Sequence, residues 1–322
     1  MNLLPDFRYH RPATLDEAVR LKASLAAARF VAGGTDLLVN LRRGLGEPSD
    51  LIDVSAVPDL ASIRADGEAL WLGAAVTLAD LARHPTVVDR YPALVDAALA
   101  VAGASHRAAA TLGGNLCQDT RCIFYNQSEW WRESNGWCLK YRGEKCHVVV
   151  KSDRCYATYH GDVAPVLMVL DAEAVLVGPD KARRIKVADL YREDGADHLT
   201  LAADEVVAAI VLPPRAQWRA GYAKARIRDG MDFPLTGVAV ALRRDGDAIG
   251  DLKVAITGTN SAPLSIDTHA LIGRAWNDEA APLLAAALKK KANALRTTIA
   301  GPKYRRRAMQ GMAKRLMNTL WA

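Results

Sequence analysis

The sequence lacks the features that place a protein in a membrane, in a secretory pathway or on nucleic acid. No apolar run approaches the roughly 20 residues that a membrane span needs. The first six residues have neither the basic nor the apolar region of a signal peptide. No helix-turn-helix or RNA-binding signature accompanies the basic residues. We therefore expect a cytoplasmic protein with no membrane and no nucleic-acid partner.

The common signatures of a self-contained active site are also missing. The chain has no Gly-x-Gly-x-x-Gly fingerprint, no P-loop and no Ser/His/Asp set. His106, His147 and His160 show no His-x-x-x-His spacing, so we interpret them as structural or surface residues. We expect no catalytic residue acting on an organic substrate in this chain.

Length and composition indicate a globular protein of two or three domains. The chain has 322 residues, of which 50% are hydrophobic and 24% charged. Its net charge of +6 is uneven, because residues 280–322 contain ten Lys or Arg and no Asp or Glu. We interpret this basic segment as a solvated face or a subunit contact.

Two glycine pairs interrupt the predicted strands and helices. A predicted strand at 28–32 runs into Gly33-Gly34 and a helix at 37–43. Backbone N–H groups gathered at a helix start suit a pyrophosphate, but taken alone the pattern favours a tight turn without a ligand. The second pair, Gly113-Gly114, follows 80 residues later and is predicted to form a similar turn.

The remaining pattern predicts a domain boundary and a second, smaller domain. A strand at 205–212 ends at Pro213-Pro214, which we take as the boundary. Strands at 222–228, 237–243 and 252–258 follow, and the pattern is helical from 266 onward, including 280–295. Strands followed by helices favour an α+β domain.

Four of the five cysteines lie within 34 residues, at Cys122, Cys138, Cys146 and Cys155. Disulfides rarely persist in a reducing compartment, so we expect metal ligation or reactive thiols. The spacing matches neither the Cys-x2-Cys pairs of structural zinc nor the compact bacterial ferredoxin motif. It leaves three possibilities open, namely an iron–sulfur cluster, a zinc site that could include His147, and buried or reactive thiols.

Several ordered motifs together resemble a known family. Residues 29–36, 73–77, 111–115, 161–167, 205–207 and 222–224 look like the FAD-binding medium subunit of the xanthine dehydrogenase and carbon monoxide dehydrogenase family. The resemblance implies an α+β chain with a PCMH/vanillyl-alcohol-oxidase-type FAD-binding domain over 1–214, in parts of about 1–57 and 58–214. A CO dehydrogenase flavoprotein C-terminal-type domain, a small antiparallel sheet with helices, would follow over 215–322.

The resemblance also implies an FAD site. Residues carried over to the diphosphate and ribityl are Arg29, Phe30, Val31, Ala32, Gly33, Gly34, Thr35, Asp36, Thr111, Leu112, Gly113, Gly114 and Asn115. Those carried over to the rest of the flavin site are Val101, Asp162, Val207 and Lys224.

The chain departs from the family by an insertion of some forty residues at about 119–158, which holds four cysteines and leaves Cys117 outside. Within the family, this pattern is similar to the β subunits of 4-hydroxybenzoyl-CoA reductases, whose extra loop binds a 4Fe-4S cluster. That similarity implies that Cys122, Cys138, Cys146 and Cys155 ligate a 4Fe-4S cluster.

The same similarity implies an electron-transfer subunit in the reductive dehydroxylation of 4-hydroxybenzoyl-CoA to benzoyl-CoA. Its expected partners are a molybdenum-cofactor large subunit, a 2Fe-2S small subunit and a ferredoxin-type donor, in a dimer of heterotrimers. One alternative is a self-sufficient FAD-dependent dehydrogenase or oxidase with a structural zinc loop. A second alternative is a binding module whose glycine turns are empty.

Overall fold

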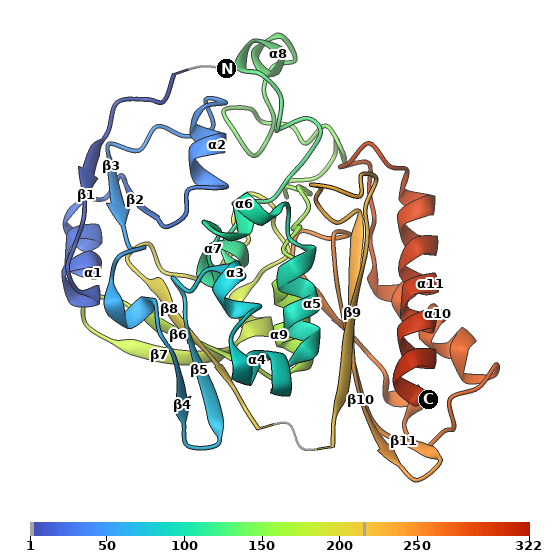
Figure 1. Cartoon of the computed structure of the whole chain (residues 1–322). Coiled ribbons are helices and arrows are strands. Elements are labelled where there is room, and N and C mark those ends of the chain that lie inside the picture. The colour runs from blue at the N-terminus through green and yellow to red at the C-terminus, as the bar shows by residue number, and fades with distance from the viewer. Residues whose placement is uncertain (1–2, 215–216) are drawn as a thin grey trace.

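A computed structural model of the chain describes residues 3–214 and 217–322 (Figure 1). The first of its sheets is parallel, with strand order β1-β3-β2. Its elements are β1 (Arg8–His10), α1 (Leu15–Ser24), β2 (Ala28–Val31), α2 (Leu37–Leu41) and β3 (Asp50–Asp53). Helix α1 begins where the Thr14 hydroxyl accepts the Glu17 N–H, as a capping residue does. Strand β2 leads into the Gly33-Gly34 segment.

The second sheet has five antiparallel strands in the order β4-β5-β8-β6-β7. They are β4 (Ile63–Asp66), β5 (Ala69–Gly73), β6 (Glu173–Val177), β7 (Ala182–Lys186) and β8 (Val206–Leu212). Strand β8 is apolar throughout and fully buried, as expected of a central strand with both faces covered. Helices between β5 and β6 are α3 (Leu78–Leu81), α4 (Pro85–Arg90), α5 (Pro92–Ala100), α6 (Ala104–Arg107), α7 (Leu112–Leu116), α8 (Glu129–Ser134) and α9 (Val163–Val169).

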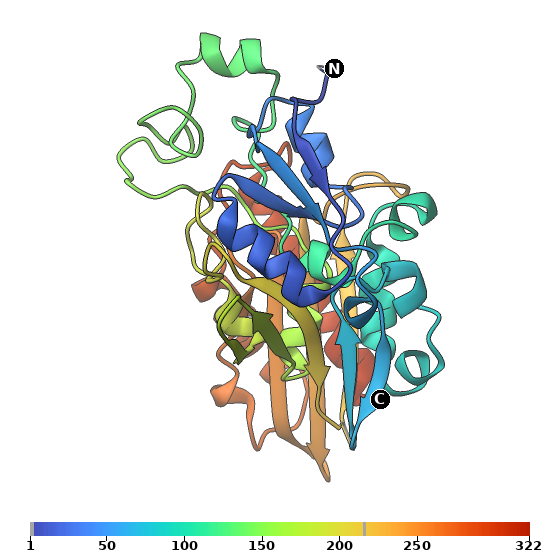
Figure 2. The same ribbon diagram turned by 90° about the vertical axis from the view of Figure 1, so that its left-hand side faces the viewer.

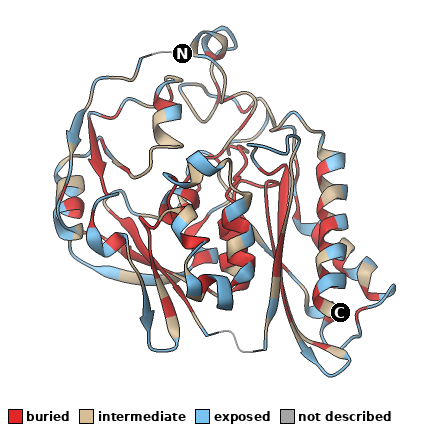
Figure 3. Cartoon of the chain, in the orientation of Figure 1, coloured by how far each residue is buried: buried red, intermediate tan, exposed pale blue. Residues whose placement is uncertain are grey.

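The third sheet is antiparallel with strand order β12-β11-β10-β9. Its strands are β9 (Arg219–Ala225), β10 (Thr236–Asp245), β11 (Ala248–Thr257) and β12 (Leu264–Ile266), and its helices are α10 (Ala280–Lys291) and α11 (Pro302–Trp321). Short 3-10 turns occur at Pro58–Leu60, Val187–Leu190 and His269–Leu271. Helices α10 and α11 cover one face of this sheet, whereas α5 and α9 lie between it and the second sheet (Figure 1). The buried residues concentrate on the two faces of this third sheet, one packed against α10 and α11 and the other against α5 and α9 (Figure 3).

The predicted fold class, α+β with a C-terminal antiparallel sheet and helices, is confirmed. Several local predictions were wrong. Residues 266–279, predicted to be helical, hold the end of β12 and a 3-10 turn at His269–Leu271 before α10 begins. Gly113 and Gly114 do not form a turn but lie in the first turn of α7, which Thr111 caps. Helix α10 ends at Lys291 and not at 295. Beyond Lys291 the backbone is no longer helical, and the Leu295 carbonyl accepts a hydrogen bond from the buried Arg305 instead of one within the helix.

The cysteine loop, by which we mean residues 119–158, projects from the body near α8 (Figure 2). Apart from α8, little of it is regular structure. Among the helices that the structure describes, none is long and apolar enough to span a membrane.

Candidate cofactor site

The conformation of the Gly33-Gly34 segment is constrained by its own backbone and by close contact with the segment around Ala109. Gly34 has φ +68°, a conformation that glycine adopts without strain. A Cβ on Gly33 would lie 1.8 Å from the carbonyl oxygen of Ala109, so only glycine fits against that backbone. The two segments predicted to hold a nucleotide therefore approach each other directly, because residue 109 leads into Thr111.

A first cavity opens where these segments meet. It has a volume of about 420 Å³. All eight residues from Arg29 to Asp36 line it, together with Thr111 and Gly114. The other predicted residues of the 111–115 segment do not line this cavity. Leu112 and Gly113 are packed in the protein interior, and Asn115 lines a second cavity. We call the first cavity the nucleotide cavity.

The second cavity has a volume of about 390 Å³ and is more apolar in its lining. Val101 and Asp162, which the resemblance assigns to the flavin site, line it, and Met231 and Phe233, which no sequence pattern indicated, contribute apolar surface. Thr35, Asp36 and Gln118 line both cavities, so the two cavities lie side by side. We call the second one the ring cavity.

A buried ion pair supports the ring cavity. The Lys224 ammonium lies 3.0 Å from Asp162 Oδ2 and donates to the Ala100 carbonyl at 2.8 Å. The Tyr222 hydroxyl donates to Asp162 Oδ1 at 2.7 Å. Burial raises the pKa of Asp162, while the Lys224 charge opposes that rise. Lys224 thus acts on the site through Asp162.

Val207, like Lys224, lies outside the lining of both cavities. It is a buried residue of the central strand β8 and contributes to the hydrophobic core beneath the helices.

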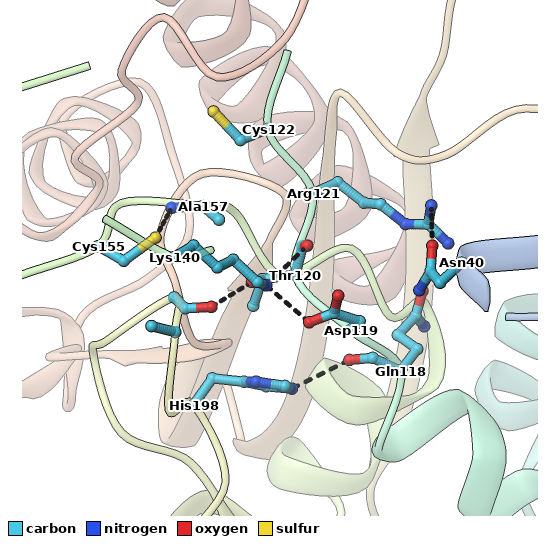
Figure 4. A network of polar contacts seen from close by, with 12 residues as sticks. Asn40, Gln118, Asp119, Thr120, Arg121, Cys122, Lys140, Cys155, Ala157 and His198 are labelled. Carbon is cyan, nitrogen blue, oxygen red and sulfur yellow. Dashed lines mark hydrogen bonds and ion pairs between the residues drawn. The ribbon is translucent and has the colours of Figure 1, made fainter. Parts of the chain in front are cut away.

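Asp36 makes contacts that no sequence pattern indicated. Its carboxylate accepts the Asp119 N–H at 2.8 Å and pairs with the Arg121 guanidinium. Arg121 also donates to Asn40 Oδ1 at 3.2 Å (Figure 4). Asp36 therefore fastens the start of the cysteine loop to the nucleotide cavity. Arg121 could not be found from spacing, because its partners lie more than 80 residues away.

The four loop cysteines line one small cavity, together with aromatic and aliphatic side chains and His147. Cys117 lies apart from them and lines the nucleotide cavity. The cysteine cavity has a volume of about 10 Å³, on the order of one water molecule. Within residues 3–214 and 217–322, no three His, Cys, Asp or Glu side chains are grouped closely enough to hold a metal ion.

The thiols are free and buried. Burial raises the pKa of Cys122 to about 11 and that of Cys155 to about 12. The thiols of Cys122 and Cys155 are therefore neutral at pH 7 in this arrangement, and metal binding would have to displace their protons. His147 is engaged elsewhere, since its Nε2 forms a hydrogen bond with the Trp137 carbonyl.

Comparisons with known proteins agree with a flavin site. Residues 5–215 match the family described as FAD binding domain in molybdopterin dehydrogenase, and residues 220–320 match the CO dehydrogenase flavoprotein C-terminal domain. The chain is 35% identical over 271 residues to the aldehyde oxidoreductase FAD-binding subunit PaoB of Escherichia coli (strain K12), which covers 81% of this chain and 84% of the relative.

Similarity to carbon monoxide dehydrogenase extends over nearly the whole chain. The identity to its medium chain from Hydrogenophaga pseudoflava is 28% over 331 residues, covering 99% of this chain and 98% of the relative. A solved structure of carbon monoxide dehydrogenase from that organism, in a form lacking the Mo-pyranopterin moiety of the molybdenum cofactor, matches with a TM-score of 0.81. It has 25% identity and covers 99% of this chain and 98% of its counterpart.

Proposed function

This chain belongs to the family of FAD-binding subunits of molybdopterin dehydrogenases, and from that premise we propose that it is the FAD and 4Fe-4S electron-transfer subunit of a molybdenum enzyme. The FAD-binding and oxidoreductase assignments follow from the family. The observation that carries the cluster is the single cavity shared by the four loop cysteines, directly beside the nucleotide cavity.

The protein's share in the chemistry is to bind and space the cofactors, because the flavin itself accepts and passes on electrons. Residues 29–36, with Thr111 and Gly114, would hold the polar part of FAD. The apolar walls of the ring cavity at Val101, Met231 and Phe233 suit a planar ring and exclude water from it.

The donor set fits a cluster by its chemistry. Four cysteine thiolates are the usual ligands of a 4Fe-4S centre. Tetrahedral zinc at about 2.3 Å from each sulfur would need the sulfurs roughly 4 Å apart. Among the described side chains no three His, Cys, Asp or Glu are grouped closely enough for a metal ion, so either centre requires the loop to rearrange. Since the cavity itself is small, the loop must widen to admit a cluster. Its exposed position and scarcity of regular structure allow that movement.

Metal analysis and the absorption spectrum of the purified chain test this proposal. We expect flavin bands on a broad iron–sulfur shoulder, with about four irons per chain. Serine at Cys122, Cys138, Cys146 or Cys155 should reduce the iron content. Cys117→Ser is the matched control and should retain it, because Cys117 lies outside the cysteine cavity.

Other results would select a different function. Flavin with one zinc and no iron would favour a self-sufficient FAD-dependent dehydrogenase or oxidase with a structural zinc loop. A chain without any chromophore would be a binding module. Loss of iron in Cys117→Ser, with Cys122→Ser intact, would reverse the ligand assignment.

The proposal includes partners and a location. A molybdenum-cofactor large subunit and a 2Fe-2S small subunit would complete a heterotrimer, which would dimerise in the cytoplasm. The named relatives support such an assembly, since they are a medium chain and an FAD-binding subunit. We also propose that the FAD-binding domain ends at 214 and that its two parts meet near 57. Co-purification with two further chains tests the assembly.

For the substrate we propose two candidates that can be separated. The cysteine insertion favours reductive dehydroxylation of 4-hydroxybenzoyl-CoA to benzoyl-CoA, with electrons from a ferredoxin-type donor. The 35% identity to PaoB favours aldehyde oxidation instead. The purified complex should be assayed with 4-hydroxybenzoyl-CoA and reduced ferredoxin, and separately with an aldehyde and an artificial electron acceptor. Turnover in only one assay decides between the two reactions.

A further inference from the structure

Lys140 is a residue of the cysteine loop that reaches two cavities. Among the described residues, Lys140 and Tyr125 are the ones that line both the cysteine cavity and the nucleotide cavity. Figure 4 shows the Lys140 side chain between Cys155 on one side and Asp119 on the other. The wall between the two cavities is therefore supplied by the loop.

The ammonium of Lys140 is buried and held by several groups. Its side chain is 6% exposed, and Nζ lies 2.6 Å from Asp119 Oδ1 and 3.1 Å from the Thr120 carbonyl. It also contacts the Thr120 hydroxyl and lies 4.5 Å from the ring centroid of Tyr125. A buried ammonium is costly unless it is compensated. Among the side chains that the structure describes, Asp119 is the one carboxylate paired with it. An anionic group in the nucleotide cavity would add a second anion.

The backbone of Lys140 is set by the cysteines. It lies in a tight turn in which the Tyr141 N–H donates to the Cys138 carbonyl at 2.8 Å. The next residue before it, Leu139, donates its N–H to the Lys145 carbonyl at 2.9 Å, and Cys146 follows directly. Any centre that binds the sulfurs of Cys138 and Cys146 therefore fixes both sides of the turn that carries Lys140.

From these contacts we infer that Lys140 couples the two cofactor sites. The inference rests on the proposed cluster. Once the loop has widened to admit a metal centre, bonds to the sulfurs of Cys138 and Cys146 would fix both sides of the turn that carries Lys140, and with it the ammonium in the wall of the nucleotide cavity. An anionic nucleotide diphosphate binds more tightly to a wall that presents a fixed cation. Loading of the cluster thus raises the affinity for FAD, and by linkage bound FAD raises the stability of the cluster.

The test is the dissociation constant of FAD, measured by flavin fluorescence with the purified chain before and after removal of iron by a chelator. Coupling between sites typically amounts to about 5- to 150-fold. We expect FAD to bind at least ~5-fold more weakly without iron. In Lys140→Met, FAD should bind weakly with and without iron, so the difference between the two dissociation constants should vanish. Lys140→Arg should restore part of that difference.

Two further variants keep the result interpretable. Lys140→Met leaves Asp119 buried without its cation, so the double variant Asp119→Asn/Lys140→Met removes both charges and should also lack the difference. Lys145→Met is the matched control, because Lys145 is an exposed lysine of the same loop that lines neither cavity. It should keep the parent difference.

The failures of the two proposals can be told apart. A chain that holds no metal would overturn the cluster and the coupling together. A chain with four irons whose affinity for FAD is the same before and after chelation would overturn the coupling alone. The coupling would also be overturned if Lys140→Met and Lys145→Met showed the same difference as the parent.

Discussion

Gly34 is the residue on whose conformation the nucleotide cavity depends most directly. Its φ of +68° is one that residues with a Cβ adopt at a cost of roughly 1–2 kcal/mol. A Cβ there would also lie 2.7 Å from Leu38 Cδ1. We therefore predict that Gly34→Ala lowers the flavin stoichiometry of the purified chain, because the turn must shift away from its place in the cavity wall.

Gly67 provides a control for the backbone strain. It has a similar φ of +61° in the turn between β4 and β5, with no neighbour near its missing Cβ. Gly67→Ala should lose a similar amount of stability in thermal unfolding but retain its flavin. Full flavin content in Gly34→Ala would remove this turn from the FAD site.

His160 makes the stability of the fold depend on pH. The side chain is buried at the ring cavity and its Nδ1 is 2.7 Å from the Pro234 carbonyl. Burial lowers the pKa of His160 to about 3, and the positive charge of Arg305 adds to that effect. Between about pH 6.5 and pH 3 the unfolded chain therefore binds a proton that the folded chain does not. Stability should fall as the pH falls through this range, by up to ~1.4 kcal/mol per pH unit.

A variant separates this effect from other acid-sensitive groups. His160→Asn keeps a side-chain N–H donor for the Pro234 carbonyl but has no titrating group. The urea midpoint of the parent should therefore drop more than that of the variant between pH 7 and pH 5. Above pH 7 the two profiles should run parallel. Equal losses in acid would show that His160 is not the source.

At the scale of the elements, the order of strands and helices was predictable because each carries a local signal. The buried strand at β8 is a continuous apolar run closed by two prolines, and α1 has a capping threonine followed by acidic residues. The ends of elements were less predictable, because tertiary contacts set them. Helix α10 stops where the following segment supplies carbonyl oxygen to Arg305, and no local pattern announces that partner.

The site residues also divide into those with a local sequence signal and those that only tertiary contacts identify. Residues 29–36 could be found because glycine pairs after strands are a local pattern, and they do line one cavity. Arg121 and Lys140 could not be found in this way. They belong to the site because Arg121 pairs with Asp36 and Lys140 pairs with Asp119, and no local sequence pattern indicates those contacts. The grouping of four cysteines was predicted from their crowding, and the structure lines one cavity with all four.

Helix α8 anchors the cysteine loop to the first sheet region through Arg132. This arginine is 1% exposed and its Nη2 donates to the carbonyls of Arg43 and Gly44 at 2.6 and 3.2 Å. Its guanidinium also stacks on Trp137 and Tyr141, at 5.5 and 5.1 Å from the ring centroids. This buried side chain, together with the more exposed ion pair between Arg142 and Glu47 at 3.2 Å, attaches the loop on this side.

Arg132→Leu should detach the loop without unfolding the body. Leaving two carbonyls without their donor costs about 1–3 kcal/mol each when they stay buried. We expect faster cleavage within 119–158 in limited proteolysis, and a smaller change in the denaturant midpoint of the whole chain. Lys151→Leu, at an exposed position of the same loop, should be cleaved at the parent rate. Equal cleavage of both variants would assign the attachment to other contacts.

At the scale of the whole molecule, the base of the cysteine loop is joined to the C-terminal sheet region. The Ile123 N–H donates to the Thr297 carbonyl at 2.9 Å, and the hydroxyls of Thr158 and Thr297 lie 2.6 Å apart. Thr297 lies in the basic segment that begins at residue 280. The N-terminal end of α11 follows within a few residues, so its exposed Lys303 and Arg307 lie on the side of the molecule where the loop begins.

This arrangement leads to a prediction about the proposed ferredoxin-type donor. An acidic one-electron carrier that approaches the loop would meet the basic end of α11, and opposite charges raise association rates at low salt. Lys303→Glu/Arg307→Glu should therefore slow reduction of the chain by reduced ferredoxin, and the effect should shrink as the salt concentration rises. Stopped-flow measurement of flavin bleaching gives the rate.

The same helix contains its own control. Lys314→Glu/Arg315→Glu makes an equal change of charge at exposed positions two to three turns further along α11, roughly 15 Å away at 1.5 Å per residue. If electrons enter through the loop, this variant should be reduced faster than Lys303→Glu/Arg307→Glu, because its new negative charges lie more than a Debye length of about 8 Å from the entry point. Equal slowing in both variants would mean that only the net charge matters. An unchanged rate in both would move the point of electron entry away from the cysteine loop, and the basic segment would then be free to serve as a contact for another subunit.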